Sequence, residues 1–311
     1  MRPPDFFIAG HEKCGTTALY EMLREHPLVF LPELKEPHFL NDERRPRFPP
    51  KLARALPQTM DEYLALFAGA RPGRLAGEAS ASYLWSHSAA ANIAALQPGA
   101  KVIAIVREPA SFLHSLHLQL QRAHYESEKD LRRAIALEAE RREEQSIPAR
   151  CPFPAILQYS DHVAYMEQLR RYLAVFAPEQ LLVLIYDDFR ADNEGTVRQV
   201  LRFLGLDDDV AVESKQANVT TRTVRSQGLD EMITSVALGS GPLSGTLKTL
   251  APRGLRRGAA RALRRRVALA EPPPLDETLA LELRRRYRHE VVALGEHLGR
   301  DLVALWGYDA L

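Results

Sequence analysis

The residues best suited to chemistry gather near the N-terminus, between an apolar run and a helical pattern. Residues 10–17 read Gly-His-Glu-Lys-Cys-Gly-Thr-Thr and follow the apolar run 6–9. A strand, a loop bounded by glycines and a helix together aim backbone N–H groups at an anion. The glycine spacing equals that of a Walker A loop, but Thr16 and Thr17 follow the second glycine and the lysine, Lys13, lies inside the loop. This pattern predicts an anion site whose lysine points away from the position it takes in a nucleoside triphosphatase.

A second cationic position follows the apolar run 102–106. Arg107 comes directly after this run, and Ser115 lies eight residues further on, in a predicted helix. Ligands of open α/β sheets bind outside the carboxyl ends of the strands, and a guanidinium is a permanently charged fork for phosphate. The alternative is an arginine that simply pairs with the neighbouring Glu108. Two anion sites on one sheet edge would suit a ligand with two well-separated phosphates.

The elements that position these residues are read from the apolar pattern. Continuous apolar runs of strand length, typical of strands buried on both faces of a parallel sheet, cover residues 6–9, 102–106 and 181–185, with a weaker run at 28–31. Helical patterns cover residues 17–25, 111–122, 128–144, 162–176, 196–204 and 279–298. Strands alternating with helices predict an α/β fold with a central parallel sheet flanked by helices. We predict one domain over residues 1–311, with a mobile or lid-like segment at about 225–274.

Composition sets limits on the function. The chain has 311 residues, of which 41 are basic and 40 acidic, so no strong net charge favours nucleic acid. Its two cysteines exclude a disulfide framework, and no stretch approaches the ~18 apolar residues of a membrane span. We therefore expect a cytoplasmic protein without nucleic-acid partners, and the excess of arginine over lysine favours a bacterial source. The arginine-rich segment 253–266 is either a solvated surface or a contact for an anionic substrate.

Together these motifs resemble those of sulfotransferases that use 3′-phosphoadenosine 5′-phosphosulfate (PAPS), in the bacterial branch related to the heparan sulfate sulfotransferase domain. The resemblance covers nearly the whole chain. It is carried by Lys-Cys-Gly-Thr-Thr at 13–17, Lys-Glu-Pro-His-Phe at 35–39, Arg107 with Ser115, the strand at 181–185, and Leu-Gly-Arg-Asp at 298–301. It implies a P-loop fold like that of the nucleotide kinases.

The resemblance also implies a reaction and the roles of its residues. A sulfuryl group passes in line from PAPS to an acceptor hydroxyl and leaves adenosine 3′,5′-bisphosphate, with no metal required. Lys13 would stabilise the leaving group and Glu36 would be the general base. The implied cofactor contacts are Lys13, Cys14, Gly15, Thr16, Thr17, Arg107, Ser115 and Arg222. The acceptor would be a saccharide, a lipid or another small molecule, and the sequence does not indicate the oligomeric state.

Other residues and other functions compete with this interpretation. His38, Glu78 or a helix histidine, His114 or His117, could serve as the base, although a surface position is expected for the helix histidines. Several relatives carry a lysine directly after the acid that matches Glu78, whereas this chain has alanine there. A P-loop kinase or ATPase is the main rival, because Asp187 follows a buried strand as a Walker B acid would. A non-catalytic anion-binding module is the third possibility.

Overall fold

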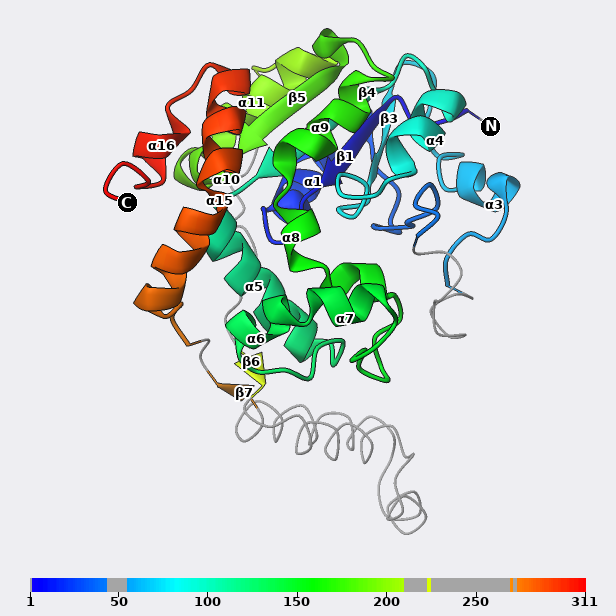
Figure 1. Cartoon of the computed structure of the whole chain (residues 1–311). Coiled ribbons are helices and arrows are strands. Elements are labelled where there is room, and N and C mark those ends of the chain that lie inside the picture. The colour runs from blue at the N-terminus through cyan, green and yellow to red at the C-terminus, as the bar shows by residue number, and fades with distance from the viewer. Residues whose placement is uncertain (1, 44–54, 210–222, 225–268, 271–272) are drawn as a thin grey trace, which may run out of the picture.

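The computed structural model describes residues 2–43, 55–209, 223–224, 269–270 and 273–311 (Figure 1). Within these ranges the centre is a five-stranded sheet with the order β2-β3-β1-β4-β5, in which every neighbouring pair is parallel. The strands are β1 (Phe6–Gly10), β2 (Val29–Phe30), β3 (Leu75–Ala79), β4 (Lys101–Val106) and β5 (Leu181–Ile185). The predicted α/β class is thereby confirmed. Arg222, the arginine-rich segment 253–266 and nearly all of the predicted lid-like segment lie outside the described residues.

The strand β1 lies in the middle of the sheet, and all of its residues are buried. Its neighbour β3 is the one strand of this sheet that the sequence pattern did not predict, because its sequence, Leu-Ala-Gly-Glu-Ala, has no long apolar run. Phe6 of β1 is paired with Gly77 of β3. A side chain at Gly77 would place its Cβ 2.1 Å from the Phe6 ring, so the glycine makes room for the aromatic ring of the central strand.

Helices cover both faces of the sheet. The connection from β1 to β2 runs toward one edge and that from β3 to β4 toward the other, so right-handed crossovers place α1 and α4 on opposite faces. α1 contacts α11, whereas α4 contacts α9, which in turn contacts α15. In Figure 1 α4 and α9 lie in front of the sheet. These helices are α1 (Thr16–Arg24), α4 (Ala89–Leu96), α9 (Tyr165–Leu173), α11 (Asn193–Leu204) and α15 (Glu277–Leu298).

The remaining elements surround this layered core. The longer ones are α3 (Met60–Ala65), α5 (Pro109–Arg122), α6 (Leu131–Ala136), α7 (Glu138–Arg142) and α10 (Tyr186–Ala191). The short ones are α8 (Tyr159–His162), α16 (Leu302–Leu305), the 3₁₀ turns η2 (Pro154–Leu157) and η3 (Pro178–Gln180), and the antiparallel pair β6 (Thr223–Val224) and β7 (Leu269–Ala270). No helix in the described ranges has both the length and the apolar character needed to cross a membrane.

The helix predicted over residues 128–144 was wrong in extent. The segment forms two short helices, α6 and α7, instead of one. Its Arg141 is buried, and its guanidinium lies 2.8 Å from the carboxylate of Glu126, which is also buried. The helix predicted over 162–176 is likewise interrupted, because α8 ends at His162 and α9 begins at Tyr165.

The tight contact between Gly77 and Phe6 predicts a cost for any side chain at position 77. Gly77→Ala should lower the free energy of unfolding by about 1–3 kcal/mol, because the added methyl group overpacks the centre of the sheet. Gly99→Ala is the matched control, since a Cβ there meets nothing closer than 3.7 Å. Denaturant titration of the two variants checks this, and equal unfolding midpoints would contradict it.

Candidate active site

The loop between β1 and α1 forms the floor of a cavity at the carboxyl edge of the sheet. Gly15 precedes the first residue of α1 with φ of 85°, a left-handed conformation that favours glycine. A Cβ at Gly15 would also lie 2.9 Å from the Phe189 ring. α1 therefore begins without a side-chain cap, at a residue that only glycine fits well.

The cavity brings together most of the loop residues and the predicted base. Its volume is about 210 Å³, and it is lined by Glu12, Lys13, Gly15, Thr16, Thr17, Glu36, Gln119 and Tyr186. Cys14 has a different place, because its side chain is fully buried and its backbone N–H donates to the carbonyl of His11 at 3.3 Å. Burial raises the pKa of the Cys14 thiol to about 12, so the thiol stays protonated.

Lys13 and Arg107 hold two positive charges beside this cavity. The Arg107 guanidinium donates to the backbone carbonyl of Lys13 at 3.3 Å, so the tip of β4 is bonded directly to the loop after β1. Burial, and then the charge of Arg107, lower the pKa of the Lys13 ammonium. Two cations whose charges act on each other in this way favour an anionic ligand beside them.

Three further contacts fix the arginine at the end of β4. Its Nε donates to the Ser111 hydroxyl at 3.1 Å, and its guanidinium carbon lies 4.8 Å from the centre of the Tyr186 ring. Its backbone carbonyl accepts a hydrogen bond from Tyr165 at 2.7 Å. Ser115 is half-buried one helical turn beyond Ser111, so the two hydroxyls lie on the same face of α5.

The segment that carries Glu36 lies along the carboxyl end of β3. The backbone N–H of Glu36 donates to the Ala79 carbonyl at 2.9 Å, and that of His38 donates to the Ser80 hydroxyl at 3.1 Å. Glu36 and His38 both have positive φ, 61° and 50°, a costly backbone conformation that is often found at functional sites. The Glu36 carboxylate lies 2.7 Å from the Lys35 ammonium and 3.7 Å from His38 Nε2, and its side chain is 38% exposed.

The competing bases occupy other surroundings. His38 is buried, and its Nδ1 lies 2.9 Å from the Ser82 hydroxyl. Glu78 lies within β3 and is fully buried, and one of its carboxylate oxygens accepts hydrogen bonds from Tyr63 and Tyr83, both at 2.8 Å. Burial raises the pKa of the Glu78 carboxyl to about 7, an effect that hydrogen bonds from neighbouring hydroxyls only partly offset.

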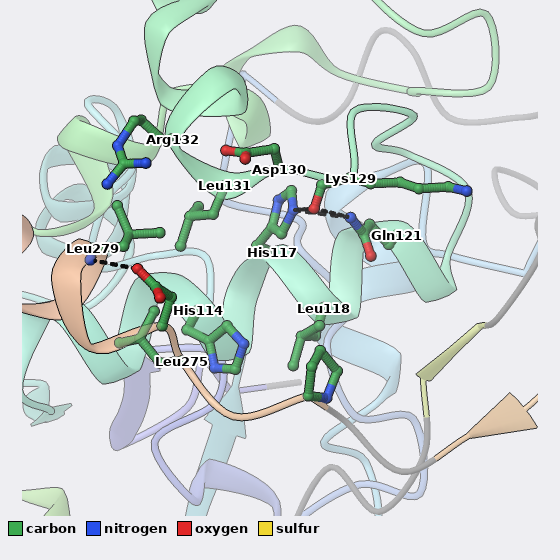
Figure 2. A pocket seen from close by; sticks show the side chains of 12 residues that line it. His114, His117, Leu118, Gln121, Lys129, Asp130, Leu131, Arg132, Leu275 and Leu279 are labelled. Atoms are coloured by element: carbon green, nitrogen blue, oxygen red, sulfur yellow. Dashed lines mark hydrogen bonds between the residues drawn. The ribbon is translucent and has the colours of Figure 1, made fainter.

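The helix histidines line a different cavity, shown in Figure 2. This second cavity has a volume of about 540 Å³ and lies between α5, the start of α6 and the start of α15. The surface position expected for His117 was wrong. His117 is buried, with its Nδ1 2.8 Å from the Tyr159 hydroxyl and its Nε2 3.1 Å from the Lys129 carbonyl. Burial lowers the pKa of both His114 and His117.

Sequence reasoning missed three residues of the first cavity, and two of them had a recognisable signal. Gln119 lies four residues after Ser115, on the same face of α5. Tyr186 directly follows β5 and so lies at the same sheet edge as Arg107. Glu12 gave no signal, because an acid inside an anion loop is unexpected. Asp187, the residue that suggested a Walker B acid, accepts a hydrogen bond from the Trp306 indole at 2.9 Å.

Comparisons with known proteins identify the family of the chain. The protein-family profile described as "Sulfotransferase domain" matches residues 3–235. The chain is 28% identical over 289 residues to carbohydrate sulfotransferase 15 of Mus musculus, covering 74% of this chain and 49% of that protein. It is 29% identical over 219 residues to the bifunctional heparan sulfate N-deacetylase/N-sulfotransferase 3 of Homo sapiens, covering 66% of this chain and 22% of that protein. The chain thus spans about half the length, or less, of the curated relatives it matches.

The crystal structure of a sulfotransferase from Alicyclobacillus acidocaldarius has the same fold. It superposes with a TM-score of 0.70 at 25% sequence identity, covering 98% of this chain and 99% of that one. The similarity therefore extends over the whole parallel sheet and its helices.

The buried carboxyl of Glu78 predicts a pH-dependent stability that a neutral replacement would remove. The ordinary pKa is 4.5 and the folded pKa about 7, so between these values the unfolded chain releases the proton and the folded chain keeps it. The contribution of Glu78 to stability is therefore fully present below pH 4.5 and is lost as the pH rises through 7, by an amount on the order of 3 kcal/mol.

Denaturation of Glu78→Gln and of the wild type from pH 4.5 to above pH 7 tests this. The variant should gain stability relative to the wild type as the pH rises. Glu167→Gln, at an exposed position on α9, should show no such gain. Parallel curves for the wild type and Glu78→Gln would contradict the prediction.

Proposed function

The chain belongs to the sulfotransferase domain family, and from this membership we propose that it transfers a sulfuryl group from PAPS to an acceptor hydroxyl. The observation that carries the proposal is the first cavity, which holds the loop lysine, the two loop threonines and Glu36 together. A cation for the leaving group and a base for the acceptor proton are the two groups that this reaction requires.

We propose that the two ends of the donor bind at two strand tips. The loop after β1, with Lys13 and the hydroxyls of Thr16 and Thr17, holds the phosphosulfate. Arg107 and Ser115 hold the 3′-phosphate. The contact between Arg107 and the loop carbonyl supports this arrangement, because it sets the two sites at a fixed separation. A cofactor role for Arg222 stays a prediction.

The transfer itself is proposed to be in line. The S–O bond to the phosphate bridge oxygen breaks while the acceptor oxygen bonds to sulfur, so negative charge develops on the leaving phosphate. The Lys13 ammonium stabilises that charge, and the Glu36 carboxylate takes the proton of the acceptor hydroxyl. Their place around one cavity supports this division of roles, and the half-exposed Glu36 can be reached by an acceptor.

A saccharide is the acceptor class that we propose to test first. Its support is the naming of the relatives as carbohydrate and heparan sulfate sulfotransferases. Lipid and other small-molecule hydroxyls are the alternatives. The kinase alternative is weaker, because Thr16 stands where the Walker lysine would be and Asp187 is engaged by Trp306.

Nucleotide binding should depend on Arg107 and on the 3′-phosphate, and it should not need Mg²⁺. Adenosine 3′,5′-bisphosphate at a hundredfold excess over its Kd should stabilise the wild type by about 2.7 kcal/mol, whereas adenosine 5′-phosphate should stabilise it less. Arg107→Ala should remove the difference between the two nucleotides, whereas Arg198→Ala, at an exposed position on α11, should keep it. Thermal denaturation measures these shifts, and stabilisation by Mg-ATP alone would favour the kinase.

Replacement of Glu36 should separate binding from transfer. Glu36→Gln should bind adenosine 3′,5′-bisphosphate as the wild type does and lose sulfuryl transfer by about 10²–10⁴-fold, because the acceptor proton has no base. Glu33→Gln, at an exposed position in the same segment, should keep transfer. Transfer is measured as the mass of one SO₃ group added to acceptors from a saccharide, lipid and metabolite panel. A fully active Glu36→Gln variant would move the base role to another residue.

A further inference from the structure

The loop between β1 and α1 contributes two residues to a buried cluster that the proposed reaction does not use. His11 and Glu12 directly follow β1, and His162 ends α8. One ligand atom of each of the three side chains lies within 4.8 Å of the others, and all three residues are buried. The imidazole rings of His11 and His162 are 6.0 Å apart between their centres. We call these three residues the loop-base cluster.

Hydrogen bonds fix the proton on the His11 ring. The side-chain amide of Gln168 donates through its nitrogen to the Asp161 carbonyl at 2.7 Å, so its oxygen must be the atom that faces His11. That oxygen lies 2.8 Å from His11 Nε2. An amide oxygen only accepts, so Nε2 carries the hydrogen and Nδ1 of the neutral ring carries a lone pair.

A hydrogen bond to a carbonyl oxygen also orients the His162 ring. Its Nε2 lies 3.3 Å from the backbone carbonyl of Ile156. A carbonyl oxygen also only accepts, so Nε2 carries the hydrogen and Nδ1 is the basic atom of the neutral ring. Each histidine of the cluster therefore donates one ring N–H to a neutral oxygen outside the cluster. Metal-binding histidines are usually oriented in this way by their outer partners.

The atoms of His11 and Glu12 that face each other are both electron-rich when the His11 ring is neutral. His11 Nδ1 lies 3.6 Å from a Glu12 carboxylate oxygen, which is longer than a hydrogen bond. Within the part of the chain that the structure describes, this nitrogen has no hydrogen-bond partner, although His11 is fully buried. A buried nitrogen lone pair beside a carboxylate is unfavourable unless a proton or a metal cation lies between them.

The position of Glu12 also favours a bound cation. Glu12 is among the residues that line the first cavity, where a carboxylate would repel an anionic ligand. The indole N–H of Trp85 lies 3.4 Å from one Glu12 oxygen, and the other oxygen faces His11. A cation bound to that second oxygen would offset the negative charge of Glu12 beside the anion site.

We propose that His11, Glu12 and His162 bind one divalent transition-metal ion of the Zn²⁺ class. Two imidazole nitrogens and one carboxylate suit Zn²⁺, Co²⁺ or Ni²⁺ and are a poor set for Ca²⁺ or Mg²⁺, which prefer oxygen. Three protein ligands leave a fourth position for water. Because two of the ligands directly precede Lys13, the ion would hold the start of the loop between β1 and α1 in place. It takes no part in the transfer step.

Metal binding to the full-length chain tests this directly, with no need for an acceptor or for PAPS. Chelator-treated protein is titrated with Zn²⁺, desalted and analysed for metal content by mass spectrometry. We expect one Zn²⁺ per chain and a higher thermal midpoint with zinc than without it. His162→Gln should lose this binding, and Gln168→Ala, which releases the His11 ring, should weaken it by about 10- to 100-fold. His114→Gln, whose ring lines the second cavity, is the matched control and should bind zinc as the wild type does.

X-ray absorption by the zinc-loaded wild type covers the case in which His162→Gln does not fold. Nitrogen and oxygen ligands at about 2.0–2.2 Å with imidazole scattering would support the cluster, whereas a sulfur ligand at about 2.3 Å would place the ion on a cysteine and overturn the proposal. The absence of tight zinc uptake by the wild type, or equal uptake by His162→Gln and His114→Gln, would also overturn it.

Discussion

The parallel pairing of β1 with both β3 and β4 is the constraint on which the rest of the structure depends. Because the three strands run in one direction, their carboxyl ends meet at one edge of the sheet. Lys13, Glu36 and Arg107 are far apart in sequence and come together only at that edge. The hydrogen bond from Arg107 to the Lys13 carbonyl then joins the central strand to its neighbour. Without this pairing the loop would remain, but neither the second cation nor the acid would lie beside it.

Short apolar runs in the sequence were sufficient to predict the strands whose residues are continuously apolar. The strands β1, β4 and β5 are continuous apolar runs, and both Arg107 and the loop that carries Lys13 directly follow such runs. β3 was missed because Gly77 and Glu78, which are unfavourable in a strand, are accommodated by side chains that lie outside the strand. Gly77 is required by the ring of Phe6, and Glu78 is stabilised by the hydroxyls of Tyr63 and Tyr83. No short window of the sequence contains Gly77 together with Phe6, or Glu78 together with Tyr63.

The same limit applies to the candidate site. The family resemblance supplied Glu36, because its Lys-Glu-Pro-His-Phe segment is short and distinctive, whereas composition alone would not have selected this acid among 40 acidic residues. Tyr186 and Gln119 come from two different elements and share the cavity only after folding. The buried pair of Arg141 and Glu126 is a further case, since Arg141 belongs to a charged helical pattern whose other charged side chains are mostly exposed. Charge patterns predict a solvated face only when no partner charge is buried with them.

The loop-base cluster and the first cavity share the loop between β1 and α1, so their charges must be considered together. Lys13 and Arg107 provide the positive charge that an anion needs, while Glu12 adds a negative charge to the same wall. An ion bound by the cluster would reconcile these features, because it would turn Glu12 from a repelling group into a ligand. The loop would then carry out two tasks with neighbouring residues. Its first two side chains would anchor it to the core through the ion, and Lys13 would stay available for the charge that develops during transfer.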